Sequence, residues 1–511
     1  MRYILGIALI LACLFSGFSL RETNIANRAI HADESEQATT AMQLYDSGEY
    51  KYNPNGPHGP TLYYWANATQ KKASAEIKIQ DYRNALTPVA VFALALLILS
   101  GRYIGRGASW GACACFAMSA IAQIYSGYFV HEIIFATLIY ALAICAWQFA
   151  CSPNIWLALA TGTLLGLAQS TKETAIISYA SMFLSFDVCA MLESRIRENI
   201  KWILWSKATP KLAFAFVLGA ICTMVALYSS FGSNWGGVAD AIKSYSHFFE
   251  KAESQAHASG FFYYFKLLFW QKCEGAKFGE LPIVLLSIFG FALAIIYREK
   301  SAWKCTFTIF AFLNALFAVL ILSMITYKTP WLLLSPMMFI CAVAGFGSAM
   351  LMSSKKIILQ IVGFVVLAGL AFWQYKLSSN ASLRYHSDPR NPYIYTHTVR
   401  DFDNLIKRVH SASKYSQYET DIPVAFVAKE SMWPAPFLLR KYRNVGFWSN
   451  DNIPQNLEIF DVIVCDYSTE KAIRKIIDKS KYDEEMYGIR KNLLLSVFIK
   501  KDILNKIISE N

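Results

Sequence analysis

The chain has 511 residues, of which 55% are hydrophobic and only 16% are charged, and its formal net charge is +12. A soluble domain has about 25% charged residues, so this composition excludes an ordinary soluble globular protein. Residues 1–20 and most of 84–376 are apolar, whereas 21–83 and 377–511 have the composition of soluble protein. We therefore predict an α-helical polytopic membrane protein with a small C-terminal α/β domain outside the membrane.

The apolar segments determine how often the chain crosses the membrane. A helix needs roughly 20 apolar residues to cross a hydrocarbon core about 30 Å thick, which gives about eleven segments, one of them short. In chain order they are 3–20, 84–100, 108–126, 129–150, 155–170, 174–190, 212–231, 280–297, 305–325, 331–352 and 357–376. Segment 3–20 could instead be a signal peptide, because Ile10-Leu11-Ala12-Cys13 resembles a lipoprotein cleavage box. We interpret it as a retained helix, since apolar sequence continues past Cys13 and no small-residue cleavage site follows.

The basic residues of the short loops set the orientation. If Met1 lies inside, the short outer loops hold only Lys172 and Lys328 as basic residues. The inner loops hold Arg102, Arg106, Arg195, Arg197, Lys201, Lys207, Lys211, Arg298, Lys300, Lys304, Lys355 and Lys356. This asymmetry predicts a cytoplasmic N-terminus in the cell (inner) membrane, with loops 21–83 and 232–279 and the tail outside. Much of the positive charge then faces acidic lipid headgroups, so no nucleic acid partner is implied.

The first outer loop contains two acidic residues before a helical segment. Asp33 and Glu34 precede apolar positions at Ala38, Ala41 and Tyr45, which share one face of a helix. Acidic residues at a helix N-terminus complement its dipole, and this structural role is as well supported by the residues as a catalytic one. His58 follows in a Pro/Gly-rich turn, where a lone histidine is more often structural than catalytic.

Three further places at the same membrane face combine ionisable and aromatic residues with apolar flanks. They are His131 and Glu132, then Lys172 and Glu173, and then Tyr327, Lys328 and Trp331. Charges at such positions are costly, so they suggest function by default. The alternatives are lysines that extend to the interface and an interfacial belt of aromatic rings. Functionally, lysines would suit a phosphate and carboxylates a hydroxyl nucleophile.

At these positions the chain resembles the GT-C superfamily of lipid-carrier glycosyltransferases. The strings are HADE at 31–34, SGEYKYNPNGPHGPTLYY at 47–64, TKETA at 171–175, YKTPW at 327–331, NPYIYTHT at 391–398 and WPAPFLLRKYRNVGFW at 433–448. Together they resemble the branch of protein O-mannosyltransferases and aminoarabinose transferases, and most narrowly a bacterial and archaeal mannosyltransferase-like family described as flippase activity-associated. One departure is that residues 127–132 lack the basic residues that such proteins usually carry before this acidic position.

The resemblance implies an inverting transfer of a sugar, expected to be a hexose, from a polyprenyl-phosphate carrier to an acceptor hydroxyl on the extracytoplasmic face. Asp33, supported by Glu34, would orient or deprotonate the acceptor, and Lys172 and Lys328 would bind the donor phosphate. The sugar or acceptor pocket would contain His58, His131, Glu132, Glu173 and Tyr327. The acceptor would be a glycan, a lipid or a protein, and membrane lipids are further partners. The resemblance implies no metal, although the Asp, Glu and His residues are compatible with a divalent ion.

These predictions divide the chain into a transmembrane domain, 1–376, and a soluble domain, 377–511. Apolar runs predict strands at Val424–Ala428, Phe460–Asp466 and Leu493–Ile499, with helices at 397–412 and 468–479. The tail contains no glycine-rich phosphate loop and no nucleophile motif, which favours a structural cap or an acceptor-recognition lid over a second active site.

Two other classes of function compete with the transferase. One is a non-catalytic component of a lipid-linked sugar flippase, and the other is a transporter. The transporter is disfavoured because the ionisable residues gather at one membrane face rather than at the midplane. The transferase and the accessory component differ in whether Asp33 performs chemistry.

Overall fold

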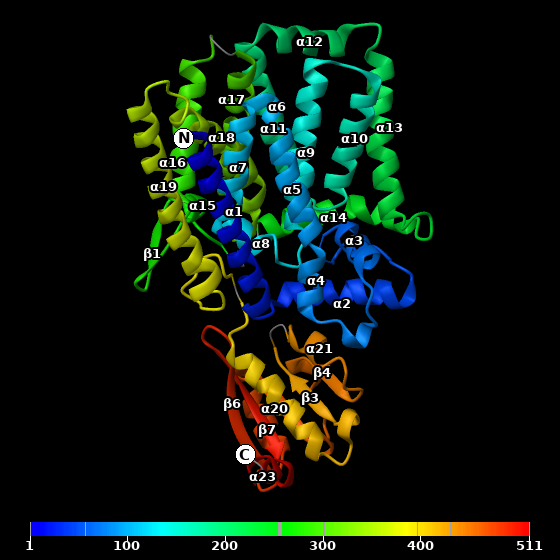
Figure 1. Ribbon diagram of the computed structural model, residues 1–511. Coiled ribbons are helices and arrows are strands. Elements are labelled where there is room, and N and C mark those ends of the chain that lie inside the picture. Colours follow the sequence, from blue (N-terminus) through cyan, green and yellow to red (C-terminus); the bar gives the residue numbers. More distant parts are fainter. Residues whose placement is uncertain are drawn as a thin grey trace. The chain divides into compact units, whose positions relative to one another are not determined.

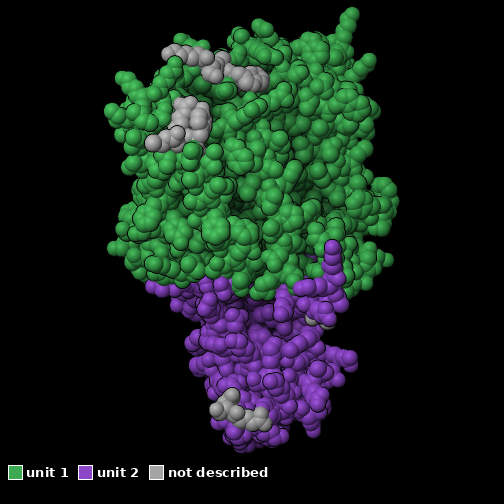
Figure 2. All heavy atoms as spheres, in the orientation of Figure 1, with its two compact units in different colours: residues 1–26, 43–70, 80–385 green, residues 27–42, 71–79, 386–511 purple. Residues whose placement is uncertain are grey.

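The computed structural model describes residues 2–56, 58–253, 258–299, 302–395, 397–429 and 432–509 (Figure 1). The chain divides into two compact units, which Figure 2 shows in different colours. The first unit consists of residues 1–26, 43–70 and 80–385, and the second of residues 27–42, 71–79 and 386–511. Residues 27–42 and 71–79 of the predicted first outer loop therefore belong to the same compact unit as most of the tail.

The first unit is a bundle of apolar helices. Among the described residues, eight helices are long and apolar enough to cross a membrane, and Ile155–Gln169 and Leu281–Ile296 are shorter apolar helices. Together they account for every predicted crossing segment except 108–126, and they make the chain a multi-pass membrane protein. The elements are α1 (Arg2–Asn27), α3 (Thr61–Thr69), α4 (Ile79–Ala85), α5 (Thr87–Leu99), α6 (Gly101–Ile104), α7 (Arg106–Met118), α8 (Ala120–Tyr125), α9 (Glu132–Cys151), α10 (Ile155–Gln169), α11 (Ala175–Leu192), α12 (Ser194–Trp205), α13 (Thr209–Tyr228), α14 (Gly236–Glu253), α15 (Tyr263–Leu268), β1 (Gln271–Cys273), β2 (Ala276–Phe278), α16 (Leu281–Ile296), α17 (Ala302–Met324), η2 (Pro330–Leu333), α18 (Leu334–Leu351), α19 (Ile357–Ser379) and η3 (Asn380–Arg384).

The remaining segment, 108–126, is broken at Ser119. This residue has an extended conformation between α7 and α8, and its side chain accepts a hydrogen bond from the backbone N–H of Ala122. The buried Glu280 carboxylate accepts two more, from the Ser119 hydroxyl and from the backbone N–H of Ile121, both at 2.9 Å. These acceptors satisfy N–H groups at the start of α8, so the predicted single helix is two helices.

Close contacts at glycines hold the bundle together. A Cβ atom on Gly162 of α10 would lie 1.9 Å from the carbonyl oxygen of Phe216 on α13. On α18, a Cβ atom at Gly345 would lie 2.2 Å from the carbonyl oxygen of Ala108 on α7. Lipid provides no hydrophobic driving force between helices, so their association depends on such close packing at small residues. Figure 1 shows α12 lying across one end of the bundle, with α14 and α15 at the other end.

The second unit contains a five-stranded sheet with helices on both faces. The strand order is β4-β3-β5-β7-β6, with β3 parallel to β4 and β5, and β7 antiparallel to β5 and β6. The elements are α2 (Ala32–Ser47, which begins in this unit), α20 (Asp401–Tyr415), β3 (Val424–Val427), α21 (Ala435–Leu438), β4 (Val445–Trp448), β5 (Val462–Asp466), α22 (Tyr467–Ile476), β6 (Tyr482–Arg490), β7 (Leu493–Lys500) and α23 (Lys501–Ser509). The three predicted strands are confirmed as β3, β5 and β7.

Alternation along the strands explains the layers of this sheet. Successive strand residues point to opposite faces. On one face Val424 and Phe426 pack with residues of α20 and α23, such as Phe402 and Ile503. On the other face the core includes Ile473 of α22. Both faces are therefore covered, which is why the central strands are uniformly apolar.

Candidate functional site

The predicted site residues fall into two groups. Asp33 and Glu34 belong to the second unit, whereas His58, His131, Glu132, Lys172, Glu173, Tyr327 and Lys328 belong to the first.

The acidic pair lies in the first turn of α2. His31, directly before the helix, accepts a hydrogen bond at its Nδ1 from the backbone N–H of Asp33, at 3.0 Å. In return the Glu34 Oε2 accepts a hydrogen bond from the backbone N–H of His31, at 3.2 Å. This reciprocal pattern matches a capping box, with a histidine in the position usually held by Ser or Thr. Residues 31–34, the string HADE, therefore cap the N-terminus of α2 themselves.

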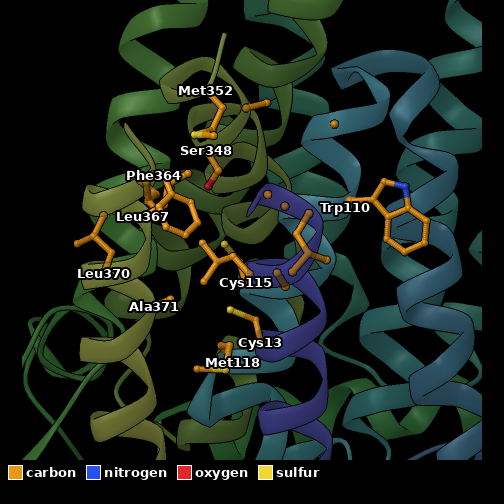
Figure 3. Close-up of a pocket in the computed structure, with 18 of the residues that line it drawn as sticks. Cys13, Trp110, Cys115, Met118, Ser348, Met352, Phe364, Leu367, Leu370 and Ala371 are labelled. Carbon is orange, nitrogen blue, oxygen red and sulfur yellow. The ribbon is translucent and has the colours of Figure 1, made fainter. Parts of the chain in front are cut away.

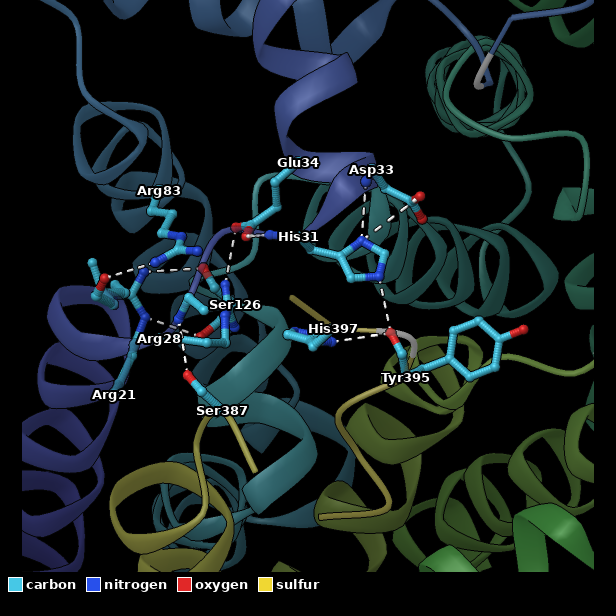
Figure 4. Close-up of polar contacts among 12 residues, drawn as sticks. Arg21, Arg28, His31, Asp33, Glu34, Arg83, Ser126, Ser387, Tyr395 and His397 are labelled. Carbon is cyan, nitrogen blue, oxygen red and sulfur yellow. Dashed lines mark hydrogen bonds and ion pairs between the residues drawn. The ribbon is translucent and has the colours of Figure 1, made fainter. Parts of the chain in front are cut away.

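The two carboxylates of the pair have different surroundings. Arg28 donates a hydrogen bond to Glu34 Oε1 at 2.9 Å, and both side chains are 0% exposed. Both oxygens of Glu34 are thus engaged by protein groups. Asp33 is 43% exposed at its side chain, with its Oδ1 3.7 Å from His31 Nδ1 (Figure 4). Because that nitrogen accepts the Asp33 N–H, it carries no proton, and the contact is not an ion pair. Asp33 is therefore the more accessible carboxylate of the pair.

A tail segment fixes His31 from the other side. The Nε2–H of His31 donates to the carbonyl oxygen of Tyr395 at 2.9 Å, and the Nδ1–H of His397 donates to the same oxygen at 3.0 Å. The two imidazole rings lie 4.6 Å apart. Burial lowers the pKa of His31 although Asp33 and Glu34 act to raise it, and burial also lowers the pKa of His397. Two neutral rings can therefore pack together and hold the start of α2.

In the first unit, a buried ion pair joins two predicted site residues. The ammonium group of Lys172, in the loop between α10 and α11, donates to the Glu132 carboxylate at the start of α9, and both side chains are buried. The neighbouring His131 donates through Nε2–H to the carbonyl oxygen of Gly59 at 2.8 Å, while its buried Nδ1 has no hydrogen-bond partner among the described residues. Burial lowers the pKa of His131, which keeps this nitrogen available as an acceptor.

Glu173 pairs with His58. Its Oε2 lies 2.9 Å from His58 Nδ1. Burial raises the pKa of Glu173, but the hydrogen bond and charge of His58 outweigh this effect and lower the pKa to about 2. His58 has a positive φ of 63°, and a Cβ atom on Gly59 would lie 2.1 Å from the Ser170 carbonyl oxygen. Close backbone packing thus places the Pro/Gly-rich turn against the Lys172–Glu173 loop.

Four tyrosines that the sequence analysis did not single out lie within electrostatic range of Glu173. The Glu173 charge acts on the hydroxyl groups of Tyr50, Tyr52, Tyr228 and Tyr245. We call these four residues the tyrosine group. Two of them lie in SGEYKYNPNGPHGPTLYY, where the spacing of the aromatic residues was a usable signal. Aromatic rings beside an ionised carboxylate suit a ligand with flat apolar faces and many hydroxyl groups.

Tyr327 and Lys328 lie on a separate loop of the same unit, between α17 and η2. Lys328 is buried, and its ammonium group donates to the carbonyl oxygen of Ile325. Burial lowers the pKa of Lys328. Tyr327 forms an antiparallel bridge with Ala258 of the loop after α14. The following Trp331 contacts the rings of Tyr125 and Tyr128, so this aromatic residue is part of the protein core.

A separate apolar cavity of about 840 Å³ lies among α1, α7, α16, α18 and α19 of the first unit (Figure 3). Its described lining includes Cys13, Met118 and Phe364, with no charged side chain and none of the predicted site residues. The cavity suits a hydrocarbon chain and offers little for polar chemistry. In the described parts of the chain, no group of three or more His, Cys, Asp or Glu side chains is placed to hold a metal ion.

The sequence and the structure of this chain were compared with those of known proteins. No family model and no curated protein sequence matches the chain. Several solved structures are similar, among them the following two. ArnT from Cupriavidus metallidurans, bound to undecaprenyl phosphate, has a TM-score of 0.61 and 12% identity over 97% of each chain. The archaeal oligosaccharyltransferase AglB from Archaeoglobus fulgidus, in complex with an inhibitory peptide and a dolichol-phosphate, has a TM-score of 0.56 and 11% identity, over 95% of this chain and 74% of that chain. The chain therefore has a GT-C-like fold.

Proposed function

We propose that the chain is a membrane glycosyltransferase that moves a sugar, a hexose, from a polyprenyl-phosphate carrier to an acceptor hydroxyl. The observation that carries the proposal is the exposed Asp33 carboxylate at the capped start of α2, beside the buried Glu34. The fold supports it, because the similar ArnT and AglB structures contain undecaprenyl phosphate and dolichol-phosphate. The mannosyltransferase-like branch rests on the sequence strings.

In the proposed reaction Asp33 accepts or orients the proton of the acceptor hydroxyl. The acceptor oxygen forms a bond to the anomeric carbon from the side opposite the phosphate. The bond from that carbon to the phosphate oxygen breaks, and its electron pair stays on the departing polyprenyl phosphate. A carboxylate within hydrogen-bond reach can supply this general-base step. Phosphate leaves readily, so its developing charge mainly needs fixed cations.

Lys172 and Lys328 are the proposed cations. An ammonium group has three N–H donors. Lys328 uses one of them for its hydrogen bond to the Ile325 carbonyl oxygen, so further donors can point at a phosphate. Lys172 is ion-paired with Glu132, so phosphate binding requires it to share or exchange that partner. We expect Lys328 to contribute more to donor affinity than Lys172, because Lys172 is paired with Glu132.

The pocket for the sugar or the acceptor is proposed to contain the predicted residues His58, His131, Glu132, Glu173 and Tyr327, together with the tyrosine group. Glu173 is ionised at neutral pH and can accept hydrogen bonds from sugar hydroxyls. We further propose that the N-terminus is cytoplasmic and the tail extracytoplasmic in the inner membrane, on the basis of the lysine and arginine asymmetry. A reporter that is active only in the cytoplasm, fused after residue 511, should then be silent.

The decisive experiment is a transfer assay with the purified full-length chain. A polyprenyl-phosphate hexose with a labelled sugar is mixed with membranes from cells that lack the chain, which supply the acceptor. We expect label to move to acceptor material while polyprenyl phosphate is released in equal amount. Binding of the donor without any release would favour the alternative, a non-catalytic component associated with a lipid-linked sugar flippase. The engagement of Glu132 by Lys172 is the observation that favours this alternative.

A further inference from the structure

The first unit carries a second polar surface, on α12, far along the bundle from α14 and α15 (Figure 1). This helix joins α11 to α13, two of the helices that are long and apolar enough to cross a membrane. Ile196 is buried, and Ile203 packs against a core that includes Ala158 of α10 and Leu212 of α13. Ala158 lies in the first turn of α10 and Leu212 in the first turn of α13. Their packing with Ile203 therefore fixes α12 at the level where these helices begin.

The outer side of this segment is strongly basic. Residues 193–211 contain five basic and two acidic residues. The basic residues are Arg195, Arg197, Lys201, Lys207 and Lys211, and all five are exposed. They belong to the loops that the sequence predicts to be cytoplasmic. Exposed lysine and arginine near a membrane surface attract acidic lipid headgroups by about 1 kcal/mol each.

Exposed tryptophans lie at the same level. Trp205 is 85% exposed near the end of α12, and Trp156 is 75% exposed at the second position of α10. Trp202 on α12 is also exposed. Indole rings favour the headgroup level of a membrane, where one side meets hydrocarbon and the N–H meets water. A helix that combines exposed indoles with a basic surface, between two crossing helices, has the features of an interfacial helix.

We propose that α12 and the following residues to Lys211 form a binding site for acidic phospholipid headgroups. The basic side chains pair with the lipid phosphates, and Trp156, Trp202 and Trp205 hold the segment at the headgroup level. Charge complementarity selects an acidic lipid as the occupant over a neutral one. This site is independent of the proposed transfer chemistry, because it uses none of the residues assigned to donor or acceptor.

The test measures lipid selectivity of the full-length chain. The protein is reconstituted in vesicles with equal parts of phosphatidylglycerol and phosphatidylcholine, extracted gently, and its retained lipids are quantified by mass spectrometry. The wild-type chain should retain an excess of phosphatidylglycerol. The variant R195Q/R197Q/K201Q should lose most of that excess, because each removed charge weakens association by about fivefold at low salt. The matched control K471Q/K475Q/K479Q removes the same charge from exposed lysines of the second unit and should keep it.

Two further measurements distinguish the loss of lipid binding from a failure of the variant to fold. The variant R195K/R197K retains the charge and should retain the excess. For the unmodified protein, the excess should fall as the salt concentration rises, since salt screens exposed charges. The proposal is overturned if the excess is insensitive to salt, if R195Q/R197Q/K201Q retains it, or if the control loses it equally. Retention of the excess in R195Q/R197Q/K201Q would leave a protein partner as the occupant of this surface.

Discussion

The start of α2 and the loop between α10 and α11 both concentrate charge, but they differ in how that charge is satisfied. At α2, Glu34 is buried against Arg28, while the adjacent Asp33 is exposed. In the loop, Lys172 pairs with Glu132, and the Glu173 carboxylate pairs with His58. An exposed charge can meet a substrate without the loss of a protein contact, whereas an ion-paired one must first share its partner. This difference is why we propose proton transfer for Asp33, and why we expect Lys172 to bind a phosphate only by sharing its partner Glu132.

The largest expected effect is on turnover, from Asp33→Asn. Asparagine keeps the size and the helix-start preference of aspartate but cannot accept a proton. We expect the transfer rate to fall by about 10²–10⁴-fold with donor binding unchanged. The matched control, Asp46→Asn, makes the same change in the last turns of the same helix and should transfer at the wild-type rate. A wild-type rate in Asp33→Asn would favour the accessory function, or Glu34 as the base, which the double variant would decide.

The next effect tests the paired side of the comparison. Lys172→Met leaves Glu132 as a buried carboxylate without its cation, which should destabilise the protein by about 3–5 kcal/mol. Replacing both partners, as in Lys172→Met with Glu132→Leu, should restore most of the stability, because an apolar pair avoids the unpaired charge. Thermal unfolding in detergent measures both variants.

The same pair of variants separates stability from donor binding. If Lys172 binds the donor phosphate, donor affinity should stay low in the double variant although its stability returns. Wild-type donor affinity in the stable double variant would show that the Lys172–Glu132 pair is structural.

Acid titration sharpens the comparison at Glu173. The pKa of this residue is lowered from 4.5 to about 2 in the folded protein. Its stabilising contribution is therefore present above pH 4.5 and is lost as the pH falls toward 2. A pKa shift of this size corresponds to roughly 3 kcal/mol in the free energy of unfolding. The unfolding midpoint should fall less steeply with acid in Glu173→Gln, and also in His58→Asn, since asparagine tolerates the positive φ at residue 58. If the unfolding midpoint fell equally steeply with acid in the wild type and both variants, the Glu173–His58 pair would not be the source of this pH dependence.

The sequence predicted most elements of the fold because long apolar runs identify crossing helices and short buried strands. It missed the break at Ser119, where a carboxylate 161 residues away in sequence accepts the Ser119 hydroxyl hydrogen bond. It also missed β4 and β6. The residues of β4 are only half-buried, and β6 contains three consecutive acidic residues, Asp483, Glu484 and Glu485, so neither strand has an apolar run.

For the site, the sequence predicted which loops carry polar residues but not how each side chain is satisfied. The Arg28–Glu34 pair is close in sequence, but the burial that distinguishes Glu34 from Asp33 depends on the surrounding fold. The Lys172–Glu132 pair joins residues 40 positions apart. Such pairings depend on tertiary structure, and a single sequence contains no periodicity that reports them.

The smallest predicted effect concerns Lys328, the cation that forms no ion pair with a carboxylate among the described residues. Methionine at this position keeps the apolar stem and removes the charge, so the loss of the hydrogen bond to the Ile325 carbonyl should cost only about 0.5–1.5 kcal/mol of stability. Donor affinity should fall by about 1.5–3 kcal/mol, the usual value of a charge-assisted hydrogen bond to phosphate. Lys277→Met is the matched control, because it removes the same charge from an exposed position of β2 in the same unit. Direct binding of a polyprenyl-phosphate sugar measures both variants. Among the described residues no carboxylate pairs with Lys328, so its variant should lose donor affinity even where stability is intact. Equal donor affinity in Lys328→Met and Lys277→Met would remove Lys328 from the donor site.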